Sequence, residues 1–185
     1  MRELIAAALA AALIAAPVTA AGQGPGEEDA RCVERVEDLE NYLRHRLDVL
    51  EKKVDDLLWF ERVGGAAFID KVYMTGPPLW KEKNPAAQGA GNPVKFWSYV
   101  FIPRGLDRSK KHPLVVFPHG GVHSSFVTYY AHIVLELVEQ GYVVVAPEYR
   151  GSTGYGRDFY EKIDYGGLET EDVWSARAYM LENYD

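Results

Sequence analysis

The sequence predicts an α/β fold, in which a partial sheet, made of a hairpin and a parallel βαβ unit, follows a long N-terminal helix. Three patterns predict it: an apolar repeat of helical period, two strand-like runs around a Gly- and Pro-rich connection, and two short apolar runs flanking a helical pattern. The 185 residues suit about one domain. Hydrophobic residues make up 48% and aromatic residues 12%, as expected for a chain with a packed core.

Residues 1–20 predict a signal peptide. Arg2 precedes an apolar stretch from Leu4 to Ala16, and small residues follow up to Ala20, where cleavage is expected. The apolar stretch is shorter than the ~20 residues of a membrane-spanning helix. We therefore expect a secreted or periplasmic protein, with an uncleaved anchor as the alternative because Glu3 weakens the positive N-terminal end.

A polar, Gly-rich linker at residues 21–30 leads into a long amphipathic helix predicted over residues 31–63. The apolar residues of this helix form a leucine stripe: Val36, Leu39, Leu43, Leu47, Leu50, Val54 and Leu57. Their mean spacing of 3.5 residues is typical of a coiled-coil seam or of a narrow docking face. Either the stripe packs against the body of its own protein, or residues 36–57 form a homo-oligomer, which Cys32 could cross-link.

A β-hairpin opens the second domain, which we place at residues 66–185. The runs "FIDKVYM" and "KFWSYVFIP" carry β-branched and aromatic residues, and a long irregular connection rich in Gly, Pro and Asn separates them at residues 77–93.

A parallel βαβ unit follows the hairpin. "PLVVF" and "YVVVAPEYRG" read as buried strands, and a helix over Phe126–Glu139 lies between them, so the strands pair in parallel through a right-handed crossover. Another helix begins near Thr170 and continues to the end of the chain. Because two parallel strands make half a sheet, we expect a truncated domain.

The segment "PHGGVHSSF" at residues 118–126, here called the glycine turn, leaves the carboxyl end of the first parallel strand. Open α/β sheets bind ligands at this edge. Adjacent glycines allow the backbone N–H groups of Gly120 and Gly121 to point at an incoming oxygen. His119 and His123 suggest a metal pair, but no third ligand is near in sequence, so neither a metal nor a cofactor is expected.

The glycine turn and the segment "PEYRGSTGYGRDFYEKIDYGGLETEDVWSA" together resemble the N-terminal part of the α/β-hydrolase domain of the prolyl oligopeptidase family of serine peptidases. The matching residues are His119-Gly120-Gly121, Tyr149-Arg150-Gly151-Ser152, Gly154-Tyr155-Gly156, Gly166-Gly167, Glu169 and Asp172. Their order and spacing fit that family from Leu114 onward.

The resemblance implies that the backbone of Gly120 and Gly121 supplies an oxyanion-hole donor, a contribution of about 3–4 kcal/mol per donor. It also implies a substrate entrance lined or braced by four side chains: His119, His123, Arg150 and Tyr155. Arg150 is expected to tie its loop down through hydrogen bonds. Glu169 and Asp172 are expected to cap the last helix, where negative charge suits the helix dipole.

No G-x-S-x-G sequence occurs in the 185 residues, although the family's nucleophilic serine sits in one. We therefore expect the Ser, Asp and His of the triad beyond this chain, which would be inactive as given. The resemblance implies the N-terminal fragment of an exported serine-type peptidase that hydrolyses peptide bonds through an acyl-enzyme. A carboxylesterase of the same fold and a non-catalytic exported oligomer held together by the helix are the alternatives.

The net charge of the chain indicates which kinds of partner to expect. A net charge of −7 and a pI near 5.3 leave no basic footprint for nucleic acid, so a peptide substrate is the expected partner. With a single cysteine the chain cannot form an internal disulfide, and its stability must come from packing.

Overall fold

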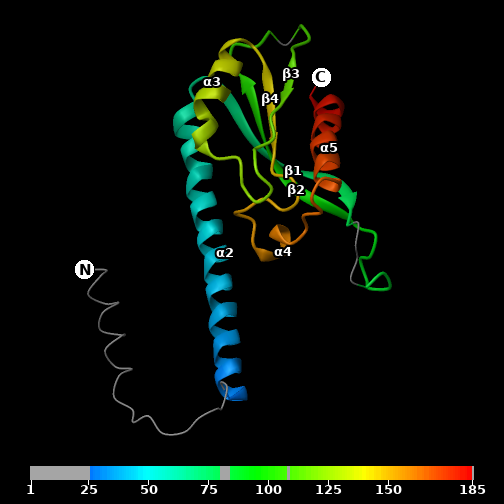
Figure 1. Ribbon diagram of the computed structural model, residues 1–185. Coiled ribbons are helices and arrows are strands. Elements are labelled where there is room, and N and C mark those ends of the chain that lie inside the picture. The colour runs from blue at the N-terminus through cyan, green and yellow to red at the C-terminus, as the bar shows by residue number, and fades with distance from the viewer. Residues whose placement is uncertain (1–25, 80–83, 108, 185) are drawn as a thin grey trace, which may run out of the picture. The chain divides into compact units, whose positions relative to one another are not determined.

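The computed structural model describes residues 26–79, 84–107 and 109–184 (Figure 1). The predicted signal peptide and half of the linker therefore lie outside the described residues. Among the described residues, those from Leu39 onward form one compact unit, and residues 26–38 belong to another. None of the helices in the described ranges is both long enough and apolar enough to cross a membrane.

The sheet of the larger unit has the strand order β1-β2-β4-β3. Its strands are β1 (Ala67–Pro78), β2 (Pro93–Pro103), β3 (Leu114–Val116) and β4 (Val143–Pro147). β1 and β2 pair antiparallel, β2 and β4 pair antiparallel, and β3 and β4 pair in parallel. The predicted hairpin and the predicted parallel βαβ unit are both confirmed.

The helix of the βαβ unit begins later than predicted. The chain forms a short 3₁₀ helix, η2 (Thr128–Tyr130), and then α3 (Ala131–Glu139), so the predicted start at Phe126 is wrong. Val127 is extended, with φ −117° and ψ 165°, so no helix can run through it. Polar contacts hold the segment in this form: the N–H of Phe126 donates to both carboxylate oxygens of Glu148 at 3.1 Å. The N–H of Thr128 donates to Asp55 at 2.9 Å.

Helices cover both faces of the sheet (Figure 1). α3 and the C-terminal part of α2 (Glu27–Val63) lie on one face, while α5 (Leu168–Asn183) covers the other. Successive side chains of a strand point to opposite faces. In β4 the two neighbours Val144 and Val145 therefore belong to different cores. A single turn of helix, α4 (Arg157–Tyr160), was not predicted from the sequence.

The part of α2 in the larger unit packs through a face that the sequence did not suggest. The leucine stripe is exposed along this helix, with Leu47 59% and Leu57 71% exposed, so its predicted packing against the body is wrong. The opposite face carries Lys52 and Trp59, both buried. Trp59 stacks on Phe126 with ring centroids 5.3 Å apart. Beside it, Asp56 accepts from Lys71 of the sheet and Asp55 accepts from the backbone N–H of Thr128.

Candidate functional site

The glycine turn provides two free backbone donors at the carboxyl end of β3. Gly120 and Gly121 are exposed, and within the described ranges the N–H of neither donates to an acceptor. Gly121 has a φ of +77°, a conformation that residues with a Cβ rarely adopt. A Cβ placed on Gly120 would meet no atom within 4 Å, so the space in front of the turn is open.

A second loop, residues 148–156, leaves the carboxyl end of β4 and is joined to the glycine turn. The N–H of Thr153 donates to the carbonyl of Ser124 at 2.8 Å, and Nδ1 of His123 donates to the carbonyl of Gly151 at 2.9 Å. The two loops meet because neighbouring parallel strands end at the same edge of the sheet.

His119 is a buried link between the two loops. The Oγ of Ser152 lies 2.6 Å from the carbonyl of Tyr149, which can only accept, so the serine proton must point there. Nε2 of His119, 2.8 Å from that Oγ, must therefore carry a proton and donate it. The two hydrogen bonds therefore run in one direction: His119 donates to Ser152, and Ser152 donates to the backbone carbonyl of Tyr149.

This direction excludes Ser152 as a nucleophile activated by His119, because His119 donates to the hydroxyl instead of accepting its proton. Ser152 is also fully buried. Burial lowers the pKa of His119 to about 4; the hydrogen bond to the Gly120 carbonyl opposes this shift, and the nearby Lys52 cation adds to it. His119 is therefore neutral near pH 7 and holds the loops in position.

His123 lies half-buried between the two loops. Its ring stacks on Tyr160, with centroids 3.6 Å apart. Because Nδ1 donates to the carbonyl of Gly151, Nε2 carries a lone pair, and the Tyr165 hydroxyl lies 3.4 Å from it. No group of three or more residues that could hold a metal occurs in the described parts of the chain.

Arg150 is fully buried and fixes the second loop to the rest of the domain. Its guanidinium makes a bidentate pair with Asp172, with both N–O distances 2.8 Å, and donates to the carbonyl of Pro77 at 2.7 Å. This contact braces the loop through hydrogen bonds and leaves the guanidinium away from any open surface. The prediction that Asp172 caps α5 is wrong, because Asp172 lies inside the helix and binds Arg150. Burial raises its pKa, and Arg150 opposes the rise.

Tyr155 lies at the other side of the second loop. Its ring meets Phe159 edge to face, 5.6 Å between centroids, and burial, reinforced by the Glu148 carboxylate, raises its pKa well above the ordinary value. Tyr155 also lines an open groove of about 550 Å³, together with Tyr73 and Trp97 from the hairpin.

Sequence reasoning missed Lys52 and Glu148, which form the charged centre beneath the two loops. Nζ of Lys52 lies 2.9 Å from the Glu148 carboxylate and also donates to the carbonyl of Phe126. Burial raises the pKa of Glu148, while Lys52 acts in the opposite direction. A lysine on the side of α2 opposite the leucine stripe and a glutamate ending an apolar strand were the only available signals.

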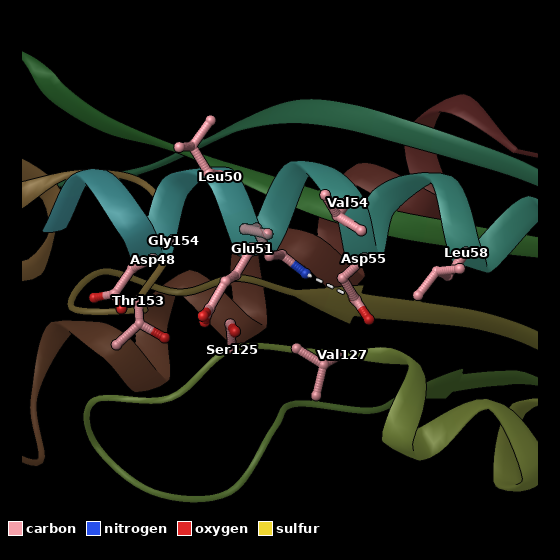
Figure 2. Close-up of a pocket in the computed structure, with 11 residues that line it drawn as sticks. Asp48, Leu50, Glu51, Val54, Asp55, Leu58, Ser125, Val127, Thr153 and Gly154 are labelled. Atoms are coloured by element: carbon pink, nitrogen blue, oxygen red, sulfur yellow. Dashed lines mark ion pairs between the residues drawn. The ribbon is translucent and has the colours of Figure 1, made fainter. Parts of the chain in front are cut away.

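A second groove, of about 510 Å³, runs between α2 and the two loops (Figure 2). Asp48 and Glu51 line it from the helix, and Ser125 and Thr153 line it from the loops. Leu50 and Val54 of the leucine stripe also line the groove, together with Leu58. The groove therefore has a mixed polar and apolar lining, and part of the leucine stripe borders it.

The sequence of the C-terminal segment matches known peptidases. Residues 128–184 match the profile of the prolyl oligopeptidase family. Over 100 residues the chain is 38% identical to "Probable dipeptidyl-peptidase 5" of Emericella nidulans, and over 99 residues 37% identical to dipeptidyl-peptidase 5 of Aspergillus oryzae. These alignments cover 52% and 51% of this chain but only 14% of the length of each relative.

Solved structures show the same fold. A puromycin-hydrolyzing peptidase of Mycobacterium tuberculosis matches 63% of this chain and 17% of its own, with a TM-score of 0.50 and 25% identity. A puromycin hydrolase matches with a TM-score of 0.51 and 22% identity, over 63% of this chain and 16% of its own. Residues 128–184 are therefore similar to the prolyl oligopeptidase family of peptidases, and the sheet is the partial α/β-hydrolase sheet that the motifs predicted.

Proposed function

We propose that this chain forms the oxyanion side of the active site of a serine-type peptidase, which hydrolyses peptide bonds through an acyl-enzyme. The Ser, Asp and His of the triad would lie outside residues 1–185, since these contain no G-x-S-x-G sequence. The whole protein's substrates would be peptides, in keeping with the peptidases that the chain matches.

The observation that carries the proposal is the pair of free N–H groups at Gly120 and Gly121. They lie at the carboxyl end of a parallel strand, in an open turn whose position is fixed by His119 and His123. Donors that are already oriented stabilise the negative oxygen of a tetrahedral intermediate without reorganisation. His119 and Arg150 act as positioning residues, holding the two loops, and His123 and Tyr155 lie where a peptide would enter.

A kinetic comparison of two glycine variants in the full-length protein tests the proposal. Gly121→Ala forces the residue away from its φ of +77° and misplaces the amide, so kcat should fall by about 10²–10³, the effect of losing one oxyanion donor. Gly141→Ala is the matched control, since Gly141 has a φ of +87° and open space but lies after α3, away from the loops. Equal kcat values for the two variants would contradict the proposal.

Chemical labelling tests the location of the nucleophile. A fluorophosphonate probe should modify one serine of the full-length protein outside residues 1–185 and abolish the cleavage of peptide amides. Modification of Ser124, Ser125 or Ser152 would contradict the proposal, and so would an unlabelled protein that cleaves simple esters but no peptides.

We also propose that the protein is exported, because residues 1–20 have the charge, apolar stretch and small-residue end of a signal peptide. N-terminal sequencing of the mature protein should begin at or near Ala21. A mature protein beginning at Met1 and retained in the cytoplasm would contradict export.

A further inference from the structure

The outward face of α2 carries a heptad repeat that the folded domain leaves uncovered. Positions 36, 43, 50 and 57 are spaced by seven and are all Val or Leu, and positions 33, 47 and 54 supply a second apolar row. These are the d and a positions of a coiled coil. In the larger unit the residues of both rows are about half exposed or more, from Leu43 at 49% to Leu57 at 71%.

The face that packs against the domain lies on the other side of the helix. Buried Lys52 and Trp59 occupy f positions of the same heptads, and Val63 occupies a c position. The domain therefore contacts the helix from the side remote from a and d. A second helix could pack along the stripe without displacing Lys52 or Trp59.

We propose that this stripe pairs with the same stripe of a second copy of the chain, in a parallel, in-register, two-stranded coiled coil. An a/d stripe is complementary in shape and polarity to another a/d stripe, and a second copy supplies one of equal length and period. The apolar stripe is too narrow for a domain core but suits a seam.

The charges beside the stripe favour the parallel arrangement. In a parallel pair each g position faces the e position five residues further along the partner, which places Arg46 opposite the partner's Glu51 on both sides of the seam. Both side chains are exposed in the structure. In an antiparallel pair centred on Leu47 and Leu50, g faces g and e faces e, so the repulsion between Arg46 and the partner's Lys53 offsets the attraction between Arg44 and the partner's Glu51.

Glu40 interrupts the a row. In the structure its carboxylate accepts from Arg44 at 3.1 Å, a contact within one helix that lessens the repulsion between the two copies. A single polar a position lowers the stability of a coiled coil but helps to fix its register.

Cysteine cross-linking of the full chain, with Cys32→Ser to remove the native thiol, tests the proposal. Two Leu50→Cys chains in a parallel dimer bring their d positions together, so oxidation should give a disulfide-linked dimer. Asn41→Cys, exposed at a b position, is the control and should stay monomeric on a non-reducing gel. Cross-linking only in a mixture of Leu47→Cys and Leu50→Cys chains would show an antiparallel pair and overturn the proposal.

Sedimentation equilibrium measures the mass of the assembly without any introduced cysteine. The chain should have the mass of a dimer, and Leu43→Glu with Leu50→Glu should give a monomer with an unchanged circular dichroism spectrum of the domain. Arg46→Glu should weaken the dimer by about tenfold, and Arg46→Glu with Glu51→Arg should restore it. A wild-type monomer at all concentrations, with the stripe covered by another part of a longer chain or by a different protein, would overturn the proposal.

Discussion

At the scale of single residues, polar groups hold the two loops in place before any substrate is present. His119 carries its proton on Nε2 and donates to Ser152, while its other nitrogen lies 3.1 Å from the Tyr149 hydroxyl. Burial and the Lys52 cation disfavour a cationic imidazole here, although the Glu148 carboxylate lies 3.5 Å from Nε2. The neutral ring is therefore part of the folded state.

This state makes stability depend on pH. The pKa of His119 is about 4 in the folded protein and 6.5 ordinarily, so the unfolded chain takes up the proton first as the pH falls. His119 makes its full contribution to the free energy of unfolding above pH 6.5. This contribution should be lost as the pH falls from 6.5 to 4, and the loss should total about 3 kcal/mol.

Urea unfolding at several pH values measures this effect. His119→Gln keeps a donor in the side chain but cannot titrate, so its free energy of unfolding should vary less over this range, with the difference attributable to His119. Parallel pH profiles for the wild type and the variant would show that His119 is not held neutral.

The buried pair of Arg150 and Asp172 should be essential for stability. Asp172→Ala leaves a buried guanidinium without its counter-ion, and we expect a loss of about 3–5 kcal/mol. The control is Glu161→Ala, which removes one partner of an exposed pair with Arg157 and should cost no more than about 0.5 kcal/mol. Thermal or urea unfolding of both variants measures the difference, and equal losses would contradict the bracing role.

At the scale of elements, α2 combines two faces with different tasks. The sequence predicted the helix and its apolar period, because a repeat of 3.5 residues is a local property. It could not predict which face meets the domain, because Lys52, Asp55 and Asp56 read as solvated charges until the loops and strands supply their partners. Trp59 and Val63 are the buried apolar residues of the inward face.

Gly154 shows how closely the second loop approaches α2. A Cβ at this position would lie 2.7 Å from the Cβ of Lys52, and the residue has a φ of +86°. Gly154→Ala should therefore destabilise the protein by about 1–3 kcal/mol more than Gly156→Ala. Gly156 is the matched control, since its φ is +90° and no atom lies within 4 Å of its added Cβ.

The free energy of unfolding of these two variants separates the effect of packing from the effect of the backbone conformation, which they share. If both alanine variants lose the same stability, the close approach of α2 to the second loop is not the reason for glycine at position 154.

At the scale of the whole molecule, the predictable parts were those encoded by short-range patterns. The hairpin and the parallel βαβ unit followed from β-rich runs and buried apolar strands. The polar contacts between residues distant in sequence could not be predicted from such patterns. The start of α3 depends on Glu148 and Asp55, which are distant in sequence and whose partners only the folded chain defines.

The site was predictable to a similar extent. The adjacent glycines predicted a place where the backbone comes close to a ligand. The family motifs indicated the chemistry. The roles of the surrounding side chains needed the structure, because Arg150 and His119 look like surface residues of a loop yet are buried and engaged.

The most direct test of the central claim is a crystal structure of the full-length protein with a peptidyl boronic acid, whose tetrahedral adduct mimics the intermediate. We predict one boronate oxygen within 2.7–3.1 Å of the backbone nitrogen of Gly120 or Gly121, the distance expected for an oxyanion donor. A tetrahedral adduct whose oxygens all bind elsewhere, with both N–H groups facing solvent, would contradict the account.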